Sequence, residues 1–129
     1  MSADGQGDVL RLLAGAVTDA PEQAHEHEPV PADQVVAGSP TTGYLALDES
    51  TAGEIGVWEM SVGAMRDVEV DEVFVVLAGA ATVEFEHVPS TGRPGDPIVL
   101  APGAVVRLEA GMKTIWTVRE PLRKVFIER

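Results

Sequence analysis

Apolar and polar residues alternate over short stretches along most of this chain, which is the pattern of half-buried β-strands. The clearest case is residues 80–87, where Ala81, Val83 and Phe85 would share one face of a strand. Residues 73–77 are instead apolar at every position, as in a central strand that is covered on both faces. One cover would be the interior of the domain, and the other would be a partner subunit.

From residue 35 onward, these stretches are separated by turn signals rich in glycine, proline and acidic residues. Short strands at spacings of about ten residues are typical of a β-sandwich or barrel. We therefore expect an all-β domain. The predicted strands are Tyr44–Leu47, Glu54–Ser61, Met65–Val70, Glu72–Leu77, Ala80–His87, Pro97–Leu100, Val105–Leu108, Lys113–Val118 and Arg123–Glu128.

The first quarter of the chain has a different pattern of apolar and polar residues. Residues 8–17 would form one short helix with its apolar positions on a single face. The segment that follows is polar and contains three prolines, so an extended arm is expected there. We predict an N-terminal arm over residues 1–34 and a barrel domain over residues 35–129.

Composition narrows the classes of partner. The chain has 129 residues, 9 Lys plus Arg against 21 Asp plus Glu, and a formal net charge of −12. Such a surface repels nucleic-acid phosphate and anionic lipid, so neither nucleic acid nor membrane is expected as a partner. There is no cysteine, which excludes disulfides and thiolate ligands. The acidic N-terminus lacks the basic start of a signal peptide, and a cytoplasmic protein is expected.

Four segments carry motifs of a known family. They read GVWEMSVG (56–63), DEVFVVLAG (71–79), APGAVVRLEAG (101–111) and IWTVREPLRKVFI (115–127). Together they resemble the small single-domain cupins akin to the ethanolamine-utilisation cupin and the ureidoglycine aminohydrolase cupin domain. The resemblance implies an antiparallel β-barrel of the jelly-roll type. It also implies a homodimer that exchanges N-terminal strands, in which Val35 and Val36 could add to the edge of a partner's sheet.

The usual metal ligands of that family are almost all missing. In metal-dependent relatives they are two histidines and a glutamate of the first motif and a histidine of the second. Only the glutamate is present, as Glu72, and Thr114 stands at the position of the last histidine. A lone carboxylate does not hold a transition metal, so no metal and no cofactor are expected. Depending on the spacing before Glu72, the other two positions are Arg66 and Val68 or Met65 and Asp67.

The two spacings predict different sites. In the first, Arg66 would pair with Glu72 where a metal otherwise sits, as a structural ion pair or as a binding group for an anionic ligand. In the second, Asp67 would lie near Glu72, and the two carboxylates could share a proton or hold a hard cation weakly. Because Asp67, Glu69 and Asp71 alternate with valines, a solvated acidic face is the simpler interpretation.

Aromatic residues in the family-like segments are candidates for a ligand pocket, although plain core packing is the simpler interpretation for each of them singly. The full predicted pocket is Arg66, Glu72, Thr114, Trp58, Trp116, Met60, Phe74 and Tyr44. The histidines do not complete it: His25 and His27 come some 45 residues before Glu72 in a proline-rich segment, and His87 ends a strand. We expect the first two on an exposed arm and the third at the surface; the alternative is an arm that folds back over the barrel mouth and brings the first two near the pocket.

Three functions are compatible with these residues. The first is a metal-free cupin that binds a small organic ligand, which would be an anion if Arg66 points inward. The second is a small enzyme acting on a sugar, a ureido compound or an amino-acid derivative, either with Glu72 as acid and base or with a metal recruited by Glu72, Asp67 and a displaced histidine. The third is a non-catalytic interaction or structural module whose pocket is filled by its own side chains.

Overall fold

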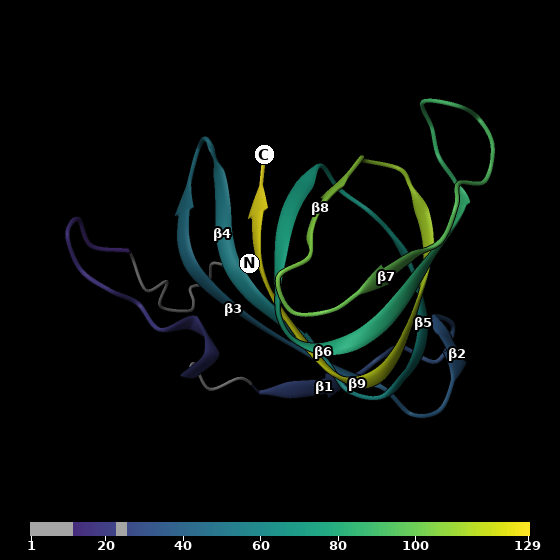
Figure 1. Cartoon of the computed structure of the whole chain (residues 1–129), viewed down its shortest axis with the longest axis horizontal. Helices are drawn as coiled ribbons and strands as arrows, with labels where there is room; N and C mark the ends of the chain where they lie inside the picture. Colours follow the sequence, from purple (N-terminus) through teal and green to yellow (C-terminus); the bar gives the residue numbers. More distant parts are fainter. Residues whose placement is uncertain (1–11, 23–25) are drawn as a thin grey trace.

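The computed structural model describes residues 12–22 and 26–129, and within them the chain is almost entirely β-structure (Figure 1). A single turn of 3-10 helix, η1 (Ala20–Glu22), precedes the strands. The strands are β1 (His27–Pro29), β2 (Val35–Ala37), β3 (Thr41–Ser50), β4 (Gly53–Met60), β5 (Gly63–Val68), β6 (Glu72–His87), β7 (Ile98–Leu100), β8 (Val105–Leu108) and β9 (Lys113–Glu128).

Strand β9 organises the barrel. Its first half pairs with β5 and its second half with β4, while its other edge pairs with β6 along nearly the whole length of both strands. The two halves of β6 continue outward to β8 and β7. All pairs are antiparallel, so the long strands β6 and β9 curve around the barrel and join its two sides (Figure 1). This confirms the predicted all-β barrel.

The prediction that β6 and β9 would each be two separate strands was wrong. Gly79 and the segment 119–122 looked like interruptions, but each lies within a continuous strand that bends there with shifts of register. At the bend Gly79 has a φ of 101° and lies directly over β9: a Cβ on it would fall 2.7 Å from the Cα of Leu122 and closer still to the carbonyl oxygen of Pro121. Only glycine permits this crossing, which keeps the two long strands paired.

The interior of the barrel is apolar over most of its depth. The largest fully buried side chains include Trp116, Phe74, Met60 and Leu122, which come from three different strands. Near the end where β6 begins and β9 ends, the inward positions become charged, and Glu72 and Lys124 are both buried. The candidate site lies at this end.

The N-terminal segment differs from its prediction. Residues 8–11 of the expected helix lie outside the described residues, and residues 12–17 contain a turn instead, in which the N–H of Ala16 donates to the carbonyl of Leu13 at 3.1 Å. Strand β1 pairs with β3, and β2 pairs with β5 of the same chain. Exchange of N-terminal strands between two copies stays a prediction. Across the described residues, no helix is long and apolar enough to cross a membrane.

Candidate functional site

A buried ion pair between Lys124 and Glu72 forms the centre of the site. Glu72 is the first residue of β6, and Lys124 lies on the adjacent strand β9 between the inward-facing residues Leu122 and Phe126. The Nζ of Lys124 donates to Oε2 of Glu72 at 2.5 Å, and the two side chains are only 6% and 8% exposed. Each charge is stabilised by the other, because neither could be buried alone without a large desolvation cost.

Three aromatic rings surround the ammonium group of Lys124. The distances from Nζ to the ring centroids are 4.2 Å for Phe74, 4.9 Å for Trp116 and 5.0 Å for Trp58. Attraction between a cation and the faces of aromatic rings contributes about 0.5–2 kcal/mol at such distances. Trp58 and Trp116 also contact each other edge to face, with their centroids 5.5 Å apart. The lysine is therefore held by one carboxylate and an aromatic cage.

A second carboxylate, Glu69, is fixed beside this pair. Its Oε2 accepts a hydrogen bond from the hydroxyl of Thr114 at 2.6 Å and another from the indole N–H of Trp116 at 2.9 Å. Glu69 is only 8% exposed, and Thr114 is fully buried. The hydroxyl of Thr114 therefore holds Glu69 in place, and the same carboxylate fixes the ring of Trp116 against Lys124.

Burial and neighbouring charges change the proton affinity of two carboxyl groups of the site. Burial, followed by the negative charge of Glu69, raises the pKa of Asp67 from 3.8 to about 6. Burial also raises the pKa of Glu72, although the charge of Lys124 and its hydrogen bond act in the opposite direction. A carboxyl group with a raised pKa in a cleft is a recognised mark of a functional site.

These groups line a cavity of about 190 Å³ at the end of the barrel. Its wall contains four carboxylates and a single ammonium group, together with four aromatic rings. A space of this size holds roughly six water molecules at about 30 Å³ each, or a small organic molecule. The lining residues are Tyr44, Trp58, Asp67, Val68, Glu69, Val70, Glu72, Trp116, Lys124, Phe126 and Glu128.

Comparison with known families identifies the fold. The family model of the EutQ-like cupin domain matches residues 47–126, which is more than half of the chain. The chain belongs to the EutQ-like cupin family. No curated protein matches it.

Solved structures show the same cupin fold at low sequence identity. The EutQ protein of Clostridium difficile superposes with a TM-score of 0.55 at 15% identity, covering 68% of this chain and 61% of its own. A protein of unknown function from Rhizobium leguminosarum gives a TM-score of 0.57 at 17% identity, covering 67% of this chain and 79% of its own. A DUF861 protein of unknown function from Pseudomonas syringae gives 0.62 at 18% identity, covering 84% of this chain and 45% of its own. At these identities the likeness concerns the fold alone.

Four of the eight residues predicted for the cupin pocket line the cavity. Phe74 supports it from the core through its contact with Lys124, while Met60 and Thr114 are buried in the surrounding walls. Tyr44 is half exposed at the rim and stacks on Phe126, with 5.9 Å between ring centroids. The four lining residues are Tyr44, Trp58, Glu72 and Trp116.

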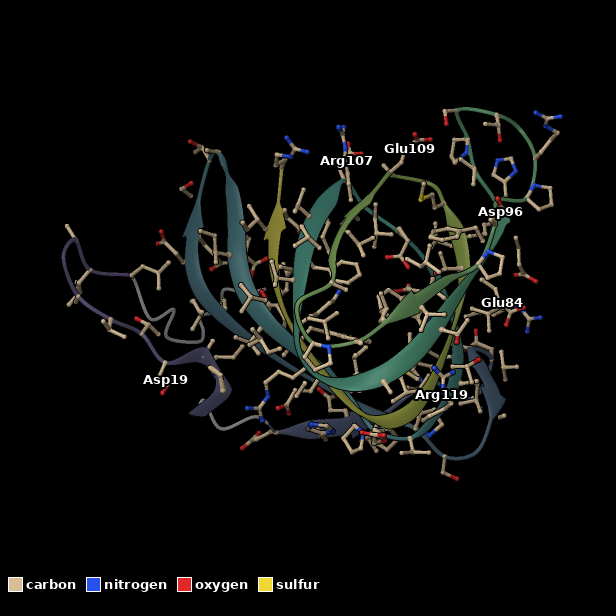
Figure 2. All side chains as sticks on the ribbon, viewed as in Figure 1. Asp19, Glu84, Asp96, Arg107, Glu109 and Arg119 are labelled. Atoms are coloured by element: carbon tan, nitrogen blue, oxygen red, sulfur yellow. The ribbon has the colours of Figure 1, made fainter. Side chains whose placement is uncertain are left out.

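Arg66 does not join them, and its predicted pairing with Glu72 was wrong. Its side chain is 54% exposed and lies 3.6 Å from Glu86 on the outside of the barrel. Its neighbour Asp67 lines the cavity instead, as the second spacing of the motif implied. Charged side chains such as Glu84 and Arg107 likewise point away from the barrel (Figure 2). The reason for expecting an anionic ligand is thereby removed.

The predicted acidic face was also wrong. Val68 and Val70 are exposed, at 62% and 48%, whereas Glu69 is buried and Asp67 lines the cavity. The usual rule that valines face inward fails here, because the inward positions belong to a polar site. Asp71 alone is exposed as expected, and its carboxylate accepts the N–H of Ala110 at 2.9 Å.

Lys124 is the most important residue that the sequence analysis missed. Its signal was present: Leu122, Lys124 and Phe126 alternate, so a lysine occupies an inward position between two apolar residues. Glu69 carried no comparable signal, because its partners Thr114 and Trp116 are more than forty residues away in the sequence. Such contacts become visible only once the pairing of β5 with β9 is known.

The histidines stay away from the cavity as far as the structure describes them. His25 lies outside the described residues. The two ring nitrogens of His27 lie 2.8 Å from Thr41 Oγ1 and from Glu59 Oε1, in a separate groove that Arg123 also lines. His87 ends β6 and is partly exposed.

The cavity does not fit the metal centre of metal-dependent cupins. Among the described residues, no group of three or more histidine, cysteine or acidic side chains is arranged to hold a metal ion. Glu72, the one retained ligand, is engaged by the ammonium of Lys124 at 2.5 Å. A divalent cation there would have to displace this hydrogen bond and then bear the repulsion of a fixed positive charge.

Proposed function

We propose that this cupin binds a small organic ligand in the cavity around Lys124 without the help of a metal ion. The observation that supports this most is the buried Lys124–Glu72 pair in its aromatic cage, opening on a cavity of about 190 Å³. Small-ligand sites are concave and mostly apolar, with a few placed polar groups, and this cavity has those properties.

The charges of the wall indicate the class of ligand. Four carboxylates face one ammonium group, so an anionic ligand would meet a net negative field, whereas amines and polyols could donate hydrogen bonds to free carboxylate oxygens. Aromatic faces such as those of Trp58 and Tyr44 suit the aliphatic or cationic part of such a molecule. A neutral or cationic ligand with several hydrogen-bond donors is therefore favoured over an anion.

Tryptophan fluorescence can test this proposal directly, because Trp58 and Trp116 are the only two tryptophans and both line the cavity. A panel of small polyols, amines, ureido compounds and carboxylates should be titrated while the emission is recorded. We expect saturable changes with polyols or amines and none with carboxylates. Saturable binding of carboxylates alone would contradict the proposed ligand class.

Two variants separate the cavity from the general surface charge. Asp67→Asn should weaken the binding of an amine about tenfold, because it removes an ionised hydrogen-bond acceptor from the wall. Glu84→Gln makes the same change of charge on the outside of the barrel and should leave the affinity unchanged. If the two substitutions changed the affinity equally, the ligand would be responding only to the overall charge of the protein and not to Asp67 in the cavity.

An acid–base enzyme is a second candidate, supported by Asp67. A carboxyl group with a pKa of about 6 is well placed to accept and return protons near neutral pH. Asp67 suits this role better than Glu72, whose proton exchange is tied to Lys124. If the panel contains a substrate, its turnover should rise as the pH passes through about 6 and should be lost in Asp67→Asn. Binding without turnover would favour a binding protein over an enzyme. No binding at all would favour the third function, a structural or interaction module.

A further inference from the structure

We propose that the cavity selects a primary ammonium group, which binds to the carboxylate of Glu69. This inference rests on the proposed function, and it deepens that function by naming one recognition residue of the chain and one chemical group of the ligand. It separates amines from polyols, which the cavity wall taken as a whole does not do.

Glu69 offers the cavity one oxygen that the protein itself does not use. Its Oε2 accepts hydrogen bonds from the hydroxyl of Thr114 at 2.6 Å and from the indole N–H of Trp116 at 2.9 Å. Its Oε1 has no hydrogen-bond partner among the residues that the structure describes, although Glu69 is only 8% exposed and lines the cavity. Because a buried carboxylate is stabilised by donors to both of its oxygens, Oε1 is the natural place for a donor on the ligand.

The charges around Glu69 favour an ammonium group as that donor. Lys124 is the one cationic side chain among the described residues that line the cavity, and it is paired with Glu72. The other three carboxylates of the wall belong to Asp67, Glu69 and Glu128. Burial and then the negative charge of Glu69 raise the pKa of Asp67, so these two carboxylates are close enough to share one cation. A ligand ammonium balances their charge, whereas a hydroxyl group does not.

Thr114 acts on the ligand only through Glu69, as a positioning residue. It is fully buried and does not line the cavity, and its hydroxyl fixes the carboxylate from behind. The indole of Trp116 can only donate, so the side-chain atom of residue 69 that faces it must be an acceptor. Glu69→Gln therefore keeps an oxygen toward Trp116 and turns the amide NH2 toward the cavity. That substitution removes both the charge and the acceptor that an ammonium group needs.

The test compares 3-amino-1-propanol with 1,3-propanediol, two molecules of equal length that differ in one ammonium group. Their affinities for the folded protein are measured at pH 7 by tryptophan fluorescence. We expect the amino alcohol to bind at least about tenfold more tightly than the diol. Glu69→Gln should reduce this ratio to less than about threefold. Thr114→Val keeps the shape of the side chain without its hydroxyl and should lower the ratio about threefold.

Glu84→Gln is the matched control, because it removes the same charge on the outside of the barrel and should preserve the ratio. The indole N–H of Trp116 gives a second readout by NMR, since it donates to the carboxylate that would bind the ligand. The chain has two tryptophans, so Trp58→Phe assigns the two indole signals. The signal of Trp116 should move further with the amino alcohol than with the diol, and this comparison decides if Glu69→Gln fails to fold.

Equal affinities of the parent protein for the two ligands would overturn the proposal and leave the donor-rich binding site intact. An unchanged preference in Glu69→Gln, or a Trp116 signal that the amino alcohol does not move, would likewise reject Glu69 as the recognition residue. No binding of either molecule would count against the proposed function as well.

Discussion

Lys124→Met removes the amine of Lys124 and keeps most of the length of the side chain. It therefore tests whether Lys124 and Glu72 form a buried ion pair that stabilises the fold. Glu72 is only 6% exposed, and Lys124→Met leaves its carboxylate without the partner that balances its charge. Breaking a buried pair in this way costs about 3–5 kcal/mol, because the remaining charge is uncompensated. Replacing both residues, as in Lys124→Met with Glu72→Leu, removes that charge and should recover most of the loss.

The measurement is urea unfolding followed by far-ultraviolet circular dichroism, since the tryptophans are too close to the substitution to report on folding alone. Lys113→Met is the matched control, and as an exposed change it should stay within about 0.5 kcal/mol of the parent. The deficit of Lys124→Met should also shrink at low pH, because Glu72 then folds as a neutral acid. A loss below about 1 kcal/mol, with additive single and double variants, would refute the buried pair.

Three further predictions concern the parts of the barrel around the site. The pKa of Asp67 is raised above its ordinary 3.8 to about 6, so the stability that its protonated form contributes is full below pH 3.8 and is lost as the pH rises through 6. Asp67→Asn should remove this pH-dependent loss of stability. Urea midpoints that change with pH in parallel for the two proteins would contradict the prediction. Gly79→Ala should prevent folding or lower stability far more than Gly103→Ala. Gly103 also has a positive φ, but a Cβ on it would have no atom within 4 Å. Similar melting temperatures for the two variants would contradict the close crossing at Gly79. Arg66→Gln should leave ligand affinity unchanged and alter stability by less than about 1 kcal/mol, because its pair with Glu86 is exposed; a lost affinity in the fluorescence titration would return Arg66 to the site.

The sequence was sufficient for the architecture because a barrel is specified by local patterns. Alternation located the strands, and the motif around Glu72 and Gly79 indicated the cupin fold. The two long strands were divided in the prediction, because a glycine bend and a true turn have the same local composition. Only the pairing of β6 with β9 shows that the chain continues.

The site was harder to predict because its charges are placed by contacts between distant strands. The two spacings of the motif could not be separated until the pairing of β5 with β9 put Asp67 opposite Thr114 on the inner side and Arg66 outside. Lys124 was overlooked for a different reason. Its alternation with Leu122 and Phe126 indicates an inward position, but lysines are rarely buried, and nothing near it in the sequence identifies Glu72 as its partner.

Lys124 places a positive charge at the centre of the site, and the carboxylate of Glu72 balances it. The same side chain is buried, and its ammonium end lies over the rings of Phe74, Trp58 and Trp116, so one residue supplies both charge and core volume. An alanine at position 124 would remove the two together and could not tell them apart. Methionine keeps the stem and removes the charge, so its effect measures the ion pair, and any difference from alanine measures the packing.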